Sequence, residues 1–237
     1  MAKQGLKKLG VIGGMGPKAT ALFYDGVIDH TVAESDQDHI DMIILNKTDI
    51  PDRTKAIISG DGQVVINALT DCATLLEKLG VSVIAMPCNT AHYYYNEIQS
   101  SVSIPMINMV QASVRCAIEQ IGDVKKIGIM ATDGTIAAAV YHDECNRQGV
   151  EPVDLSSERQ SDVMSIIYDD VKSGKLGDPE KFNRVIEEFM QKECDAVILA
   201  CTELSVYKEN FGVPDFCIDS TDVLVKEAIL MTGAQYK

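Results

Sequence analysis

The chain has 237 residues, enough for one large α/β domain or for two small ones. Its 35 Asp and Glu residues outnumber the 21 Lys and Arg residues, which leaves a formal net charge of -14. A chain this acidic is repelled by phosphate backbones and anionic lipids, so we expect no nucleic-acid or membrane partner. The 46% of apolar residues also excludes a disordered protein.

Short apolar segments alternate with longer amphipathic ones along the chain. The short segments predict strands at Leu9–Ile12, Ile40–Leu45, Val81–Met86, Met106–Ile107, Ile127–Met130 and Ala196–Leu199. The longer ones predict helices over residues 17–33, 62–79, 91–100, 109–121, 135–148, 158–173, 179–192 and 220–231. Strands that alternate with helices indicate an α/β fold with parallel sheets.

The two halves of the chain resemble each other. KKLGVIGGMGPKATALFY, which begins at Lys7, aligns in constant register with KKIGIMATDGTIAAAVY, which begins at Lys125. Later in each half an apolar strand ends in a cysteine, Cys88 in VSVIAMPCNT and Cys201 in CDAVILACTE. We therefore predict two similar domains, each a parallel sheet flanked by helices, related by pseudo-twofold symmetry. Ligands of such sheets bind beyond the carboxyl ends of the strands, so the site is expected in the cleft between the domains.

Two facing cysteines suggest a specific chemistry. Cys88 and Cys201 each precede a predicted helix start, where free N–H groups and the helix dipole are expected to lower the pKa of a thiol. One thiolate and one thiol on opposite faces of a bound carbon could remove a proton from one face and deliver a proton to the other. This is general acid–base catalysis that inverts a stereocentre without a cofactor.

Five segments carry a family resemblance: GVIGGMGPKAT (10–20), PDRT (51–54), PCNTAH (87–92), ATDGT (131–135) and ACTEL (200–204). Together they resemble the aspartate/glutamate racemase superfamily, and GGMGP and PCNTAHYYY are most similar to the cofactor-independent aspartate racemases. The resemblance runs from about Leu6 to the end of the chain. Glutamate racemases usually have Thr-His after the second cysteine, where this chain has Thr202-Glu203.

The resemblance implies an organisation as well as an activity. The C-terminal helix is expected to return to the first domain, which gives a first domain of residues 1–109 plus 213–237 and a second of residues 110–212. Cys88 belongs to the first domain and Cys201 to the second. The activity implied is racemisation of an amino acid, most simply aspartate, without cofactor or metal. A homodimer is also implied.

Two cations are expected to bind the carboxylates of the substrate. Asp52-Arg53 matches the family's Asp-Arg pair, and an Arg guanidinium can hold a carboxylate with two parallel hydrogen bonds. Lys172 matches the second cationic contact by its distance before Cys201, and Lys175 is an alternative that the sequence leaves open. Two cations in one site would select a substrate with a second carboxylate, hence aspartate over neutral amino acids.

The other candidate residues lie on the loops around the cysteines. Thr132 and Thr135 follow a predicted strand, where hydroxyls and helix N–H groups could bind the α-carboxylate or simply cap the helix. The remaining candidates for substrate contacts are Met15, Gly16, Asn89, Thr90 and Thr202. By resemblance, Asp52 and Glu203 are expected to orient or assist the thiols.

Several alternatives remain open from the residues alone. Gly14–Ala19 matches the G-x-G-x-x-G/A pattern of a dinucleotide-binding loop, but the acidic residue expected after the next strand is missing. Cys88 and His92 are one helical turn apart and could form a hydrolase pair. A glutamate or broad-specificity racemase, or a non-catalytic amino-acid-binding protein of two lobes, also fits the pattern.

The remaining cysteines and the start of the chain bear on the cellular setting. The seven cysteines form no C-x-x-C pair and no His stands at zinc-ligand spacing, so we expect no metal. The N-terminal segment has no apolar run of the kind found in a signal peptide. Free thiols are typical of a reducing compartment, so we expect the protein in the cytoplasm. Five thiols are interpreted as structural: Cys72, Cys116, Cys145, Cys194 and Cys217.

Overall fold

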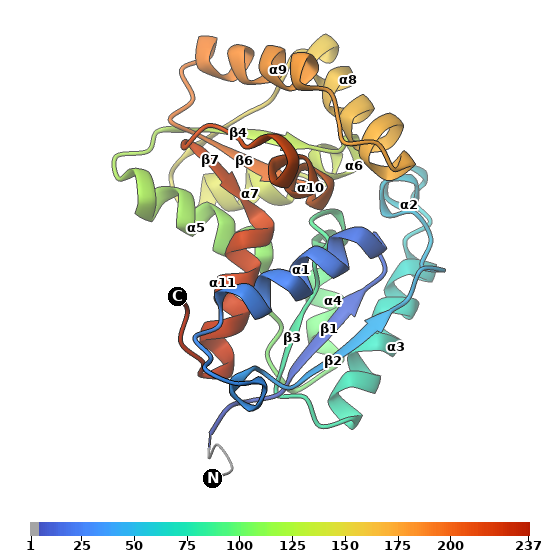
Figure 1. Ribbon diagram of the computed structural model, residues 1–237. Helices are drawn as coiled ribbons and strands as arrows, with labels where there is room; N and C mark the ends of the chain where they lie inside the picture. Colours follow the sequence, from blue (N-terminus) through green and yellow to red (C-terminus); the bar gives the residue numbers. More distant parts are fainter. Residues whose placement is uncertain (1–4) are drawn as a thin grey trace.

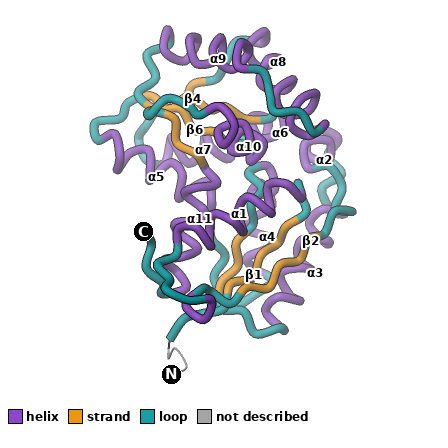
Figure 2. Tube along the Cα trace, in the orientation of Figure 1, coloured by secondary structure: helices purple, strands orange, loops and turns teal. Residues whose placement is uncertain are grey.

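The computed structural model describes residues 5–237, and its first half is built on a three-stranded parallel sheet in the order β2-β1-β3 (Figures 1 and 2). Residues 1–4 of the predicted first domain and of the N-terminal segment lie outside this range. The strands are β1 (Leu9–Gly13), β2 (Met42–Asn46) and β3 (Val83–Ala85). The helical elements are α1 (Pro17–His30), η1 (Asp36–Asp38), α2 (Arg53–Ser59), α3 (Gln63–Lys78), η2 (Thr90–Tyr94) and α4 (Tyr95–Ser100).

The second half is built on a four-stranded parallel sheet in the order β5-β4-β6-β7. Its strands are β4 (Lys126–Ala131), β5 (Glu151–Val153), β6 (Ala196–Ala200) and β7 (Cys217–Asp219). The helical elements from this point of the chain are α5 (Met109–Ile121), α6 (Asp133–Ala137), α7 (Val140–Arg147), α8 (Ser157–Ser165), η3 (Ile166–Asp170), η4 (Val171–Ser173), α9 (Pro179–Gln191), α10 (Thr202–Phe211) and α11 (Ser220–Thr232). Two parallel sheets flanked by helices confirm the predicted α/β fold of two similar halves.

The repeat seen in the sequence is visible in the sheets. β1 lies between β2 and β3, and β4 lies between β5 and β6 in the same way. Even the fourth strand has a counterpart, because Met106 forms a single parallel bridge with Ile84 of β3 where β7 pairs with β6. The predicted strand at Met106–Ile107 is thus reduced to one bridge.

The glycine that follows the paired lysines serves the same purpose in both halves. A Cβ atom on Gly10 of β1 would lie 2.8 Å from a methyl group of Val81, and one on Gly128 of β4 would lie 2.5 Å from the ring of Phe189. Each glycine therefore leaves room for a large side chain to pack against its central strand. The shared KK[LI]G pattern thus has a packing cause.

The last helix of each half crosses to the other half. α5 follows the Met106 bridge of the first sheet but packs against α7, β6 and β7. α11 follows β7 of the second sheet but packs against α1 and β3, and α5 and α11 pack against each other (Figure 1). These contacts support the proposal that α11 belongs to the first domain, whereas β7, which lies within residues 213–237 of the predicted first domain, pairs in the second sheet. We propose that the boundary falls at Ser220.

Several predicted elements differ in detail from the observed ones. The helix predicted over 135–148 is divided into α6 and α7 at Ala139, whose φ of 54° is left-handed. The helix predicted over 158–173 continues from α8 into a π-helical stretch, η3, and then a 3-10 turn. β5 and β7 were not predicted because each has only three residues and little apolar character, and α2 was also missed. α10 begins directly after Cys201, where a helix start was predicted. No helix of residues 5–237 is long and apolar enough to cross a membrane.

Candidate active site

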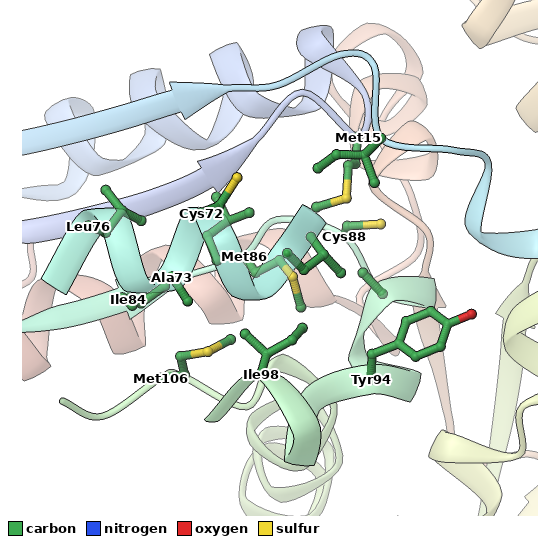
Figure 3. Packing of buried hydrophobic residues seen from close by; sticks show 14 of the residues in the cluster. Met15, Cys72, Ala73, Leu76, Ile84, Met86, Cys88, Tyr94, Ile98 and Met106 are labelled. Atoms are coloured by element: carbon green, nitrogen blue, oxygen red, sulfur yellow. The ribbon is translucent and has the colours of Figure 1, made fainter. Parts of the chain in front are cut away.

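Both cysteines line one small cavity. Cys88 follows β3 and Cys201 follows β6, so the cavity lies at the carboxyl ends of equivalent strands. Figure 3 shows Cys88 and Met15 at the same end of the first-half core. The residues that line the cavity are Met15, Asp52, Arg53, Thr54, Cys88, Asn89, Thr90, Thr132, Tyr168, Lys172, Cys201, Thr202 and Glu203.

Cys201 is held by a carboxylate. Its Sγ donates a hydrogen bond to Oε2 of Glu203 at 3.0 Å, and both side chains are buried. Burial, and then the negative charge of Glu203, raise the pKa of Cys201 well above its usual value, against a smaller lowering by Lys172. The expectation that the helix start would lower this pKa is therefore wrong for Cys201, because burial and Glu203 outweigh the free N–H groups of α10.

His92 does not act on Cys88 as a base. Its Nδ1 donates to the backbone carbonyl of Cys88 at 2.9 Å, and its Nε2 accepts from the backbone N–H of Met109 at 3.1 Å. Burial lowers the pKa of His92, against weaker opposing effects of its hydrogen bonds. A neutral imidazole that joins the Cys88 loop to the start of α5 is a structural group, which argues against the hydrolase alternative.

Lys172 is the lysine of the cavity. Its Nζ lies 4.0 Å from Oε1 of Glu203 and 4.1 Å from the centre of the Tyr168 ring, a cation–π contact. Burial opposes its charge, but Glu203 and the other nearby groups outweigh this and raise the pKa of Lys172. The side chain of Lys175 is 67% exposed, against 28% for Lys172, and pairs with Asp170 outside the cavity.

Arg53 is the first residue of α2, and its guanidinium donates only to backbone carbonyls in the described part of the chain. Nη1 donates to Ile50 at 3.1 Å and Pro51 at 3.0 Å, and Nη2 donates to Met15 at 3.3 Å. Nε is buried and has no partner among residues 5–237. Carbonyl oxygens fix the side chain without neutralising its charge, so Arg53 can still attract a carboxylate.

Asp52 caps the helix that Arg53 begins. Its Oδ1 accepts from the backbone N–H of Lys55 at 2.9 Å, and its Oδ2 accepts from the hydroxyl of Tyr168 at 3.4 Å. The carboxylate lines the cavity, but both oxygens are held by contacts that position α2 against η3. Asp52 therefore fits an orienting role better than a direct contact with a thiol.

Four threonine hydroxyls form a cluster that joins the two halves: Thr54, Thr90, Thr132 and Thr135. Thr90 Oγ1 lies 2.8 Å from Thr135 Oγ1 and 3.3 Å from Thr132 Oγ1. Thr54 donates to Thr132 at 3.4 Å. Thr132 also caps α6, since its Oγ1 accepts from the backbone N–H of Thr135 at 3.2 Å. Each hydroxyl has one proton, so a threonine of this cluster donates to an anionic group only by giving up a hydrogen bond within the cluster.

The cavity includes eleven of the thirteen predicted site residues, with Gly16 and Thr135 just behind it. A Cβ on Gly16 would lie 3.4 Å from Oε1 of Glu203, and Thr202 donates to Oε2 of Glu203 at 3.4 Å. The side-chain amide of Asn89 is engaged by protein groups. Asn89 therefore lines the cavity with a side chain that other residues already hold.

Sequence reasoning missed two residues of the cavity, Thr54 and Tyr168. Thr54 directly follows Asp52-Arg53 in PDRT, so its position beside two predicted site residues could have identified it as a candidate. Tyr168 lies four residues before Lys172 in a predicted helix, a spacing that brings two side chains together.

The structure holds the other five cysteines in packed surroundings. Burial raises the pKa of Cys145 and of Cys217 to about 12 each, and that of Cys194 to about 11. Burial also raises the pKa of Cys72 and of Cys116. None of these five thiols lines the cavity of Cys88 and Cys201, which agrees with a structural role. Within residues 5–237 no group of three or more His, Cys, Asp or Glu residues could hold a metal ion.

Two α/β halves with a thiol at each of two equivalent strand ends, facing one cavity with two cations, define an isomerase of the amino-acid racemase class. The family described as Asp/Glu/Hydantoin racemase matches residues 12–228. The chain belongs to this family.

Individual relatives differ in the substrate that their names state. The broad specificity amino-acid racemase RacX of Bacillus subtilis (strain 168) is 31% identical over 225 residues, which cover 93% of this chain and 96% of the relative. The structure of Picrophilus torridus aspartate racemase is 31% identical with a TM-score of 0.82, and the match covers 97% of this chain and 96% of that one. The structure of glutamate racemase from Francisella tularensis subsp. tularensis SCHU S4 in complex with D-glutamate is 18% identical, with a TM-score of 0.69. The match covers 95% of this chain and 80% of that one, and it shows a shared fold.

Proposed function

We propose that this protein interconverts L- and D-aspartate by a two-base mechanism, with Cys88 and Cys201 on opposite faces of the α-carbon. The observation that carries the proposal is the pair of thiols from equivalent strand ends in a single cavity. The pseudo-twofold relation of the halves supports the placement of the two thiols on opposite sides of a bound substrate. Neither a metal nor a pyridoxal group enters the proposed chemistry.

Charge supports a substrate with two carboxylates. Arg53 forms no ion pair with the residues that the structure describes. Lys172 forms one with Glu203, across 4.0 Å. The side-chain carboxylate is proposed to bind these two cations, in agreement with the name of the Picrophilus torridus relative. The α-carboxylate is proposed to bind the threonine cluster and the start of α6.

The contacts proposed for the α-carboxylate should also increase the rate of α-proton removal. Loss of the α-proton places negative charge on the carboxylate, so donors that already point at it lower the barrier. The hydroxyls of Thr90, Thr132 and Thr135 are buried and held close together by their mutual contacts, and we propose that they turn their protons to the carboxylate when it binds.

The proton steps follow from the state of Cys201. Its thiol is protonated and hydrogen-bonded to Glu203 in the resting site. With Cys88 as thiolate, Cys88 removes the α-proton from one face and Cys201 delivers its proton to the other. The enzyme is left with a Cys88 thiol and a Cys201 thiolate, which is the form that takes up the opposite enantiomer.

A broad-specificity racemase is the second candidate, supported by the similarity to the Bacillus subtilis relative. One experiment tests both candidate functions. The protein is incubated in D₂O with L-aspartate, L-glutamate or L-alanine separately, and the products are analysed by NMR and chiral chromatography. Rapid α-deuteration with inversion of aspartate alone supports the first proposal, and similar rates for all three support the second. Binding without any α-deuteration at stoichiometric enzyme would instead identify a non-catalytic binding protein.

We propose the oligomeric state and the cellular location of the protein from its composition and its resemblance to the family. The resemblance to the racemase family implies a homodimer, and the free thiols fit a cytoplasmic location. Sedimentation velocity at micromolar concentration tests whether the protein is a homodimer. A single species with the mass of one chain would contradict the homodimer. Cell fractionation tests the cytoplasmic location.

A further inference from the structure

A chain of buried hydrogen bonds, here called the Asn89 network, crosses between the two halves. The hydroxyl of Tyr141 on α7 donates to Oδ1 of Asn89. Nδ2 of Asn89 donates to Oγ of Ser220 at 3.0 Å, and Oγ of Ser220 donates to the backbone carbonyl of Leu199 at 2.7 Å. Four segments of the chain are therefore joined by one continuous set of hydrogen bonds.

Two residues of this network are next to the two thiols. Asn89 directly follows Cys88, and Leu199 on β6 lies two residues before Cys201. The only residue between them is Ser220, the first residue of α11, which begins where β7 ends (Figure 1). The network thus connects the loop of one thiol with the strand of the other.

The network is rigid for physical reasons. Tyr141 and Ser220 are 0% exposed and Asn89 is 2% exposed. Burial raises the pKa of Tyr141, so its hydroxyl keeps its proton and remains a donor. A satisfied polar network in a dry interior resists rearrangement, since each group that loses its partner is left unsatisfied away from water.

We propose that Asn89, Ser220 and Tyr141 are positioning residues that set the separation of the two catalytic thiols. This inference rests on the proposed two-thiol mechanism. Inversion requires both thiols to be correctly placed around one α-carbon, whereas exchange of the α-proton with retention requires only one thiol. Loosening the network should therefore lower the rate of inversion more than the rate of exchange.

The repeat supplies a natural substitution for the test. The position equivalent to Tyr141 in the first half is Phe23, which is also fully buried. Tyr141→Phe removes the hydroxyl and keeps the ring, so the core should stay packed. Ser220→Ala removes the central hydroxyl of the network.

A matched control is available on the same helix as Ser220. Thr232, at the other end of α11, is 0% exposed, and its Oγ1 donates to the carbonyl of Ile229 at 2.7 Å. Thr232→Val removes a buried hydroxyl and its backbone hydrogen bond far from the thiols. It reports the effect of a structural loss alone.

The experiment measures inversion and α-deuteration with retention for both aspartate enantiomers in D₂O, together with thermal melting. A misplacement of about 1 Å can cost about 100-fold in rate, so we expect the ratio of inversion to exchange to fall about 10- to 100-fold in Tyr141→Phe and Ser220→Ala. Thr232→Val should keep the wild-type ratio.

The outcomes separate this inference from the proposed function. If Tyr141→Phe keeps the wild-type ratio, even with both rates reduced, the network has only a structural role and the inference is wrong. The same variant decides the matter if Ser220→Ala does not fold. A wild-type protein that shows neither exchange nor inversion of any amino acid would overturn the proposed function, and this inference with it.

Discussion

The thiol of Cys201 donates to the carboxylate of Glu203 across 3.0 Å, and Lys172 lies 4.0 Å from the other carboxylate oxygen. A negative group beside a buried thiol opposes formation of a thiolate. This arrangement favours the protonated thiol, which agrees with the proposed role of Cys201 as the acid.

The single cysteine variants should separate exchange from inversion. Cys88→Ala and Cys201→Ala are each expected to lower racemisation by at least about 1,000-fold, since a positioned general acid or base contributes about 10²–10⁴-fold. Each variant should still exchange the α-proton of one enantiomer with D₂O, and the two variants should act on opposite enantiomers. NMR of each enantiomer measures this. Near wild-type racemisation by either variant would rule out the two-base mechanism.

Replacing Glu203 should make Cys201 more acidic. Glu203 raises the pKa of Cys201, so Glu203→Gln removes one of the two main causes and the pKa should fall, although burial still keeps it raised. Thiolate absorbance near about 240 nm, followed during a pH titration in a Cys88→Ala background, should therefore rise at lower pH than with Glu203 intact. Glu209→Gln, at an exposed position on α10, is the control and should leave the titration unchanged.

The two cations should matter most for a substrate with two carboxylates. Arg53→Ala and Lys172→Ala are each expected to raise KM for aspartate about 10- to 100-fold, because a hydrogen bond to a charged group is worth about 1.5–3 kcal/mol. Lys175→Ala is the matched control and should stay within about twofold, since solvent-exposed charges contribute little. Steady-state kinetics with aspartate and alanine check this. Equal effects on both amino acids would remove the cations from side-chain recognition.

The contributions of the ring and of the hydroxyl of Tyr168 can be measured separately. Tyr168→Phe keeps the ring under Lys172 and loses the hydroxyl contacts with Asp52 and Thr54, both at 3.4 Å. These contacts are long, so we expect a reduction in kcat/KM of about two- to fivefold. Tyr168→Leu also removes the cation–π contact and should cost about 10-fold more, as such contacts contribute about 0.5–2 kcal/mol. Equal activity of the Phe and Leu variants would show that the ring does not hold Lys172.

Much of the fold could be predicted because its signals are local. The alternation of apolar and amphipathic segments depends only on near neighbours in the chain. The need for glycine at Gly10 and Gly128 instead comes from side chains distant in the sequence, Val81 and Phe189. The short strands β5 and β7 could not be predicted, since three residues carry too little pattern. The break at Ala139 likewise has no glycine or proline to mark it.

The sequence by itself determined the two-halved α/β fold, the equivalence of Cys88 and Cys201, and most residues of the cavity. Only the tertiary structure placed Lys172 rather than Lys175 in the cavity, brought Tyr168 to it, and bound Asn89 to Ser220. It also reversed the expected direction of the Cys201 pKa. The physical reason is that burial and the partners of a charged or polar group come from segments distant in sequence. Whether a group is buried, and what it then binds, is settled only when those segments pack.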